Sequence, residues 1–259
     1  MGDKVRYDVS GSVATVTIAR PDVRNAMDMD VFAGLAEAGA RAGADPAVRA
    51  VVVTGDGPNF SSGIDTSVFT AGGNGSPSDI DIGRLQSSFT IFEKILKPTI
   101  AAVAGPTFGA GLQLAIACDF RVAADDVQLS VMEVRWGILP DLGATQRLPR
   151  MVGLGRAKEL AMTARRVGAA EALQIGLVNK VVAEGQHLKA ATEWARELAA
   201  GPPLALAAIK RLMNGAFDAP VAAGLDREAT AQRRILASAD FIEAVSARVQ
   251  KRDPHFEAR

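Results

Sequence analysis

Residues 99–113 read TIAAVAGPTFGAGLQ, an apolar run followed by a glycine-rich turn that leads into a helical pattern. A second run of the same kind, AVVVT at 50–54, also precedes a short loop. Continuous apolar runs of this length are typical of parallel strands that are covered on both faces. We therefore expect an α/β fold with these two strands inside the core.

The surrounding sequence extends this pattern. Residues 14–18 alternate apolar and hydroxyl side chains, as a half-buried strand does, and short strands are expected at 120–123 and 127–131. Asp28 or Asp30 can cap a helix whose apolar residues recur at helical spacing.

Beyond about residue 185 only helical patterns remain, and Gly201-Pro202-Pro203 separates two of them. We expect an α/β core over residues 1–200 and a helical region over 201–259. The glycine-rich and serine-rich stretch at 70–78 is interpreted as a flexible surface loop within the core.

Composition excludes several functions. Lys plus Arg and Asp plus Glu both number 29, so no overall basic field attracts nucleic acid or an anionic membrane. The single Cys118 cannot form an intrachain disulfide, and His187 and His255 have no metal-ligand spacing to it. The N-terminus has no apolar run like that of a signal peptide, and no stretch approaches the roughly 20 residues that span a bilayer. A cytoplasmic location is expected.

Two loops that follow buried strands can supply hydrogen-bond donors. Residues 59–65 follow the strand at 50–54, and residues 104–113 follow the strand at 99–104. Small residues let a substrate oxygen approach the backbone, and the free N–H groups at a helix start favour negative charge. Each loop could offer one N–H to a developing oxyanion. A purely structural turn explains the same glycines.

The segment 132–149 places two carboxylates, Glu133 and Asp141, eight positions apart (141 − 133). A carboxyl group near Trp136, Ile138 and Leu139 is expected to have a raised pKa, which suits proton transfer near neutral pH. The alternative is structural: Glu133 pairs with an arginine, either Arg135 or Arg147, and Asp141 caps the helix that follows.

These segments, in this order, resemble the crotonase (enoyl-CoA hydratase/isomerase) superfamily over nearly the whole chain. The resemblance implies a ββα spiral core with a C-terminal helical trimerisation region, and a catalytic role for Glu133. The matching motifs are Ala19-Arg20-Pro21 with Asn25-Ala26-Met27, Phe60 with Gly63-Ile64-Asp65, Gly109-Ala110-Gly111, 143–148, Thr163-Ala164-Arg165 and 170–178.

By this resemblance, the backbone N–H groups of Ile64 and Ala110 stabilise the enolate of an acyl-CoA thioester. The implied coenzyme A contacts are Arg24, Asn25, Ala26, Asp65 and the C-terminal Lys251, for which a solvated charge is an equal alternative. No cofactor or metal is implied, because coenzyme A is part of the substrate. The implied partners are copies of the same chain, in trimers that usually pair into hexamers, and the sequence does not select between trimer and hexamer.

One departure from the family pattern bears on the reaction. Hydratases of the family carry two glutamates twenty positions apart, and here the first falls on Gln113 (133 − 113 = 20). An amide cannot exchange a proton as a carboxylate does. Asp141 resembles the second acid of dienoyl-CoA isomerases, although those carry Asp where Gln113 stands. The sequence therefore favours double-bond isomerisation, with Glu133, Asp141 and Gln113 as the catalytic set.

Three other interpretations stay open. The chain could be an enoyl-CoA hydratase that uses Glu133 alone, or a non-catalytic acyl-CoA-binding member of the family. A serine hydrolase of related fold, such as the Clp proteases, is disfavoured because neither histidine lies near a candidate serine and Ser61 and Ser62 lack the Gly-x-Ser-x-Gly context.

Overall fold

The computed structural model describes residues 3–70 and 80–257, so most of the loop predicted at 70–78 lies outside the described residues. Within them, a six-stranded sheet has the order β1-β2-β3-β4-β6-β9. β1 is antiparallel to β2, and every other neighbouring pair is parallel. The strands are β1 (Val5–Ser10), β2 (Val13–Ile18), β3 (Ala50–Gly55), β4 (Thr99–Val103), β6 (Phe120–Ala124) and β9 (Lys180–Val182).

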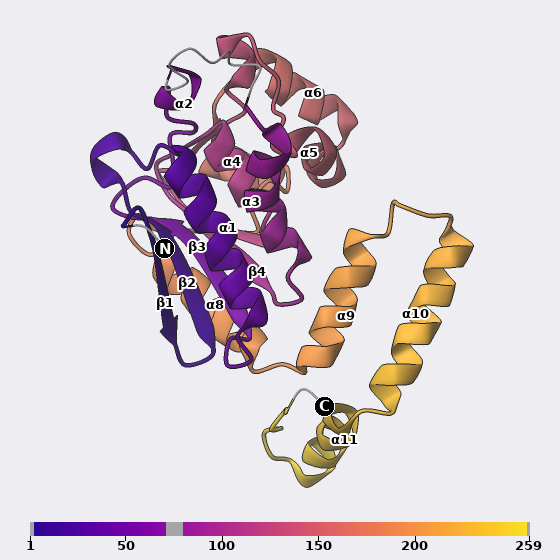
Figure 1. Cartoon of the computed structure of the whole chain (residues 1–259). Helices are drawn as coiled ribbons and strands as arrows, with labels where there is room; N and C mark the ends of the chain where they lie inside the picture. The colour runs from indigo at the N-terminus through magenta and orange to yellow at the C-terminus, as the bar shows by residue number, and fades with distance from the viewer. Residues whose placement is uncertain (1–2, 71–79, 258–259) are drawn as a thin grey trace.

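Helices cover both faces of this sheet, which explains why β3 and β4 carry continuous apolar runs. α1 (Met29–Ala44) and α3 (Ile82–Lys94) lie on one side, as Figure 1 shows. On the other side, alanines of α8 (His187–Ala199) pack against Val52 and Ile100. α1 begins at the expected place, and the side chain of Asp28, not Asp30, caps it by accepting a hydrogen bond from the Val31 N–H at 3.0 Å.

A smaller sheet positions the two donor loops. It contains β5 (Pro106–Phe108), β7 (Gln128–Ser130) and β8 (Val167–Gly168), with β5 parallel to β7 and β7 antiparallel to β8. A parallel bridge joins Ser61 to Thr107 of β5. Residues 59–65 and 104–113 are therefore held side by side although they follow different strands.

Four more α-helices of the core lie at one end of the main sheet (Figure 1): α2 (Ser67–Thr70), α4 (Ala110–Ala115), α5 (Ala144–Val152) and α6 (Leu154–Thr163). α7 (Ala169–Gln174) packs against β8 and β9.

Three helices form an arm that extends from the core (Figure 1): α9 (Pro203–Asn214), α10 (Val221–Leu236) and α11 (Ala239–Gln250). The buried Lys210 fastens α9 to the core, because its Nζ lies 2.8 Å from Asp119 Oδ2 and donates to the Phe92 carbonyl at 2.8 Å. At the other end of the arm, Arg49 donates to the Phe256 carbonyl.

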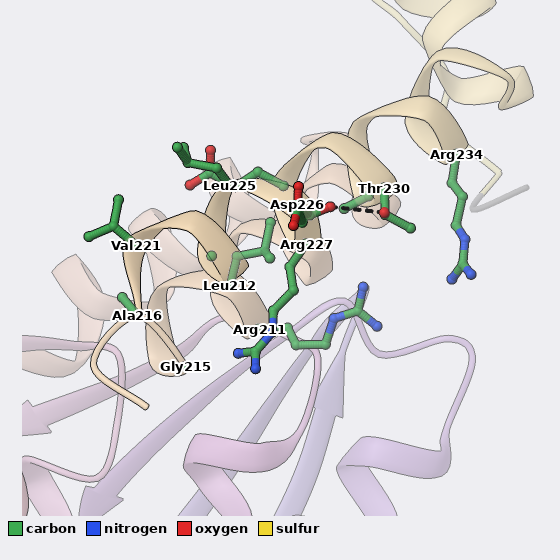
Figure 2. Close-up of a pocket in the computed structure, with 13 residues that line it drawn as sticks. Arg211, Leu212, Gly215, Ala216, Val221, Leu225, Asp226, Arg227, Thr230 and Arg234 are labelled. Atoms are coloured by element: carbon green, nitrogen blue, oxygen red, sulfur yellow. Dashed lines mark hydrogen bonds between the residues drawn. The ribbon is translucent and has the colours of Figure 1, made fainter. Parts of the chain in front are cut away.

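A cavity of about 600 Å³ lies between α9 and α10 (Figure 2). Its walls combine arginines with apolar side chains such as Leu212 and Leu225. All of its lining residues come from α9, α10 and their connection, so this cavity is separate from the loops that carry the candidate chemistry. The arm also exposes large apolar side chains: Ile209, Met213, Phe217, Val221, Leu225, Ile242 and Val249.

The expected strands at 14–18, 50–54, 99–104, 120–123 and 127–131 are confirmed to within one or two residues. β1 was not predicted. Of the helices in the described part of the chain, none combines the length and apolarity that a bilayer crossing requires.

Candidate active site

The glycine-rich turn after β4 leaves the Ala110 N–H free at the start of α4. The Phe108 N–H donates to the Ser61 carbonyl at 3.0 Å, and the Gly109 N–H donates to the Ser130 carbonyl at 2.9 Å. The next N–H belongs to Ala110, the first residue of α4. Gly109 has φ of 51°, a left-handed conformation that favours glycine, and this conformation turns the chain into the helix.

The second donor comes from the loop after β3. Two hydrogen bonds join Met27 to this loop: the Met27 N–H donates to the Gly63 carbonyl, and the Asp65 N–H donates to the Met27 carbonyl. The Ile64 N–H, which lies between them, takes no part in either bond. Neither the Ile64 nor the Ala110 N–H donates to another described residue. The loops are close, because a Cβ built on Gly63 would lie 3.7 Å from the Ala110 nitrogen. Two free N–H groups on adjacent loops are suited to an oxyanion.

Glu133 lies beside these donors. It opens the short 3-10 helix Glu133–Trp136, and only 6% of the residue is exposed. A Cβ built on Gly109 would lie 3.3 Å from Glu133 Oε1, which places the carboxylate against the turn that leads to Ala110. Among the described residues, Glu133 Oε2 is buried without a hydrogen-bond partner. This oxygen is therefore available to a bound substrate.

Gln113 holds the other oxygen of Glu133. Its Nε2 donates to Glu133 Oε1 at 2.7 Å, and its Oε1 accepts from the Ala144 N–H at 3.1 Å. Of the two ends of an amide side chain only the oxygen accepts a hydrogen bond, so the Ala144 N–H fixes which end of the Gln113 amide faces Glu133. The proton of a neutral Glu133 is consequently directed to Oε2.

Burial raises the pKa of the Glu133 carboxyl above its ordinary value, and the nearby negative charge of Asp141 adds to this effect. The hydrogen bond from Gln113 acts in the opposite direction, because it favours the ionised form. Burial also raises the pKa of Asp141, which is half-buried. The predicted direction for Glu133 is confirmed.

The predicted surroundings of Glu133 are wrong. Trp136, Ile138 and Leu139 are 66%, 43% and 62% exposed in the single chain. These sequence neighbours therefore do not bury the Glu133 carboxyl group. The carboxyl is instead covered by segments that the fold brings to it, including α4 through Gln113.

The structural alternatives for the two carboxylates are also wrong. Arg147 pairs with Glu93 at 2.7 Å, and Glu133 forms its hydrogen bond with Gln113. Asp141 does not cap α5, because the residue at the cap is Gly143, which offers no side-chain hydrogen bond.

Comparison with known proteins identifies the family of this chain. A sequence model described as enoyl-CoA hydratase/isomerase matches residues 8–259. The chain belongs to this family. It is 36% identical to the peroxisomal Delta(3,5)-Delta(2,4)-dienoyl-CoA isomerase of Arabidopsis thaliana over 97% of this chain and 95% of that one. It is 34% identical to the carnitinyl-CoA dehydratase of Salmonella heidelberg over the full length of both.

Solved structures of the enoyl-CoA hydratase/isomerase family share the whole fold, so the predicted fold class is confirmed. An enoyl-CoA hydratase from Polaromonas sp. JS666 superposes with a TM-score of 0.93 at 33% identity, over 98% of this chain and 99% of that one. A Thermobifida fusca protein described as an enoyl-CoA hydratase was solved in complex with CoA. It superposes with a TM-score of 0.84 at 40% identity, over 90% of this chain and 93% of that one. The relatives carry isomerase, dehydratase and hydratase names, so family membership alone does not select the reaction.

The residues predicted to bind coenzyme A occupy different environments. Arg24 is exposed, and Ala26 is buried with its carbonyl accepting from Arg20 at 2.6 Å. Asn25 is fully buried and ties the loop down, since its Nδ2 donates to two backbone carbonyls and its Oδ1 accepts from the Arg20 N–H. Asp65 forms a salt bridge with Arg20 at 2.9 Å. The pKa of Asp65 is lowered, and the largest cause is a hydrogen bond from the Ser67 backbone N–H.

Lys251 lies apart from this loop. It directly follows α11 on the arm, and α11 lies well away from α4 within one chain (Figure 1). Its predicted contact with coenzyme A, like those of Arg24, Asn25, Ala26 and Asp65, stays a prediction.

The nucleophile expected of a serine hydrolase is not available at Ser61. This residue is fully buried, and its hydroxyl donates to the Asn25 carbonyl at 2.8 Å. Within residues 3–70 and 80–257, His, Cys, Asp and Glu side chains form no group of three that could hold a metal ion.

Proposed function

We propose that this chain is an enoyl-CoA isomerase in which Glu133 carries the transferred proton and Asp141 extends the transfer to dienoyl substrates. The observation that supports it most directly is the pairing of Glu133 with Gln113. At the two positions where a hydratase of this family has two carboxylates, this chain has one carboxylate and one amide whose two polar atoms are both engaged.

The reaction follows from these groups. Glu133 Oε2 takes a proton from the carbon next to the thioester, and the C–H electrons move into a dienolate whose charge rests on the thioester oxygen. The Ile64 and Ala110 N–H groups stabilise that oxygen. Glu133 then returns the proton to the far end of the conjugated system, so the double bond has moved and no water has been added. The raised pKa of Glu133 keeps both proton transfers accessible near neutral pH.

Asp141 supports the dienoyl form of the reaction. In a 3,5-dienoyl thioester the carbon that receives the proton lies two atoms further from the thioester than in a 3-enoyl thioester. Asp141 is a second carboxylate whose charge raises the pKa of Glu133 and whose own pKa is raised by burial, and it can act at that greater distance. The dienoyl-CoA isomerase of Arabidopsis thaliana is a relative of this chain along nearly its whole length.

A panel of 2-enoyl, 3-enoyl and 3,5-dienoyl thioesters tests the proposal, with ultraviolet absorbance and product mass as readouts. Isomerised products of unchanged mass are expected from the 3-enoyl and 3,5-dienoyl substrates, with slow hydration of crotonyl-CoA. Rapid hydration of crotonyl-CoA without isomerisation would favour the hydratase that uses Glu133 alone. Binding of every thioester without turnover would favour a non-catalytic member of the family.

A further inference from the structure

The turn before α5, residues 141–144, is held in place through its backbone. Gln86 of α3 donates from Nε2 to the Asp141 carbonyl at 2.6 Å. Arg147 of α5 donates from Nη1 to the Leu142 carbonyl at 3.0 Å. Two successive carbonyls of the turn are therefore tethered by side chains, beside the residue whose N–H binds Gln113.

Arg147 can hold this carbonyl because α3 fixes its guanidinium group. Its Nε and Nη2 both donate to Glu93 Oε2, at 2.9 and 2.7 Å, and Nη2 also lies 3.3 Å from Thr90 Oγ1. The guanidinium is planar and rigid, so these contacts leave Nη1 aimed at the Leu142 carbonyl. Only 12% of the Arg147 side chain is exposed, which limits competition from water.

Gly143 makes room for this arrangement. Its φ of 106° lies in the region that favours glycine, and a Cβ at this position would lie 1.9 Å from Arg147 Nη1. The glycine thus lets the arginine cross the turn, but it also makes the turn intrinsically flexible. A flexible turn needs external tethers if it is to hold a carboxylate in one position.

We infer that Gln86 and Arg147 are positioning residues that hold Asp141 beside Glu133. This inference rests on the proposed function, because the position of Asp141 matters for the reaction only if Asp141 takes part in proton transfer. Without them the 141–144 turn can rotate, and the Asp141 carboxylate, already half-buried, can turn toward solvent. α3 thereby holds the turn that carries Asp141 through the Asp141 backbone carbonyl.

The test compares Gln86→Leu and Arg147→Met with the parent enzyme on 3-enoyl and 3,5-dienoyl thioesters. We expect kcat on the dienoyl substrate to fall about tenfold or more, as misplacement of a catalytic group does, with KM little changed. Turnover of the 3-enoyl substrate should change less than about twofold, because the shorter transfer needs only Glu133. Arg150→Met is the matched control, since Arg150 lies in the same helix but faces Asp218 at 3.7 Å.

Double variants separate the inference from the proposed function. In an Asp141→Asn background, Gln86→Leu should cause no further loss on the dienoyl substrate, because both changes act through one group. If Asp141→Asn alone affects both substrates equally, the proposed role of Asp141 is wrong. If Asp141→Asn is selective but Gln86→Leu and Arg147→Met slow both substrates equally, the positioning role is wrong. Gln86 is exposed on α3, so its variant should fold even if Arg147→Met does not.

Discussion

Replacement of Gln113 by methionine removes both hydrogen bonds of the amide while keeping a side chain of similar length. One lost hydrogen bond is the 2.7 Å bond to Glu133 Oε1. A hydrogen bond to an ionised group contributes about 1.5–3 kcal/mol to the free energy of unfolding. The Ala144 N–H, now buried without an acceptor, costs about 1–3 kcal/mol more. Glu133 can become neutral and so recover part of the first loss. We therefore expect the free energy of unfolding to fall by about 3 kcal/mol, or about 6–12 °C in melting temperature.

The same substitution should change the pH dependence of isomerisation. Glu133 must be ionised to accept a proton, so activity falls as the pH drops through its pKa. Gln113 favours the ionised form, and its removal raises the pKa of Glu133 further, which moves this loss of activity to higher pH.

The assay is kcat/KM for a 3-enoyl thioester across the pH range, with differential scanning fluorimetry at constant protein concentration. Leu112→Met is the control, because it changes a buried neighbour in α4 at nearly constant volume and should cost less than about 1.5 kcal/mol. A Gln113→Met enzyme whose activity falls at the same pH as the parent would show that the amide does not tune Glu133.

Four further outcomes are expected. Gln113→Glu restores the second carboxylate of a hydratase and should raise hydration of crotonyl-CoA above the parent rate, as product mass will show; an unchanged rate would mean that more than this carboxylate is missing. Gly63→Ala should lower kcat by about tenfold or more, since φ of 110° strains alanine and the added Cβ lies 3.0 Å from the Phe108 carbonyl, which shifts the loop that carries the Ile64 N–H; full activity would argue against an oxyanion site there. Coenzyme A at millimolar concentration should raise the melting temperature, and adenine nucleotides without the pantetheine arm should raise it less; no shift with coenzyme A would contradict binding at this site. Light scattering at micromolar concentration should give a trimer or hexamer, because the arm exposes large apolar side chains; a particle of 27.0 kDa would contradict this.

The strands and the donor loops could be predicted because their signals are local. The runs at 50–54 and 99–104 are apolar without interruption, and both strands are buried on both faces. β1 carried a local signal too, since Val5, Tyr7 and Val9 alternate with polar residues, and this alternation would have identified it.

The environment of the carboxylates could not be predicted in the same way. Apolar neighbours in sequence suggested that Trp136 and Leu139 bury Glu133, but those side chains point outward in the single chain, and distant segments cover the carboxyl. The tether from Gln86 joins α3 to the turn before α5 across 55 positions of sequence, whereas the tether from Arg147 spans only 5 positions. Such contacts depend on how α3 packs against α5, for which spacing along the chain gives no signal.

The central claim is that Glu133 carries the proton in an isomerisation, and Glu133→Gln tests it most directly. The substitution keeps the shape of the side chain and removes the group that accepts and returns the proton. In a 3-enoyl thioester assay, kcat should fall by about 10²-fold or more while the thermal shift caused by coenzyme A is preserved. A Glu133→Gln enzyme that isomerises the 3-enoyl thioester at the parent rate would contradict the account.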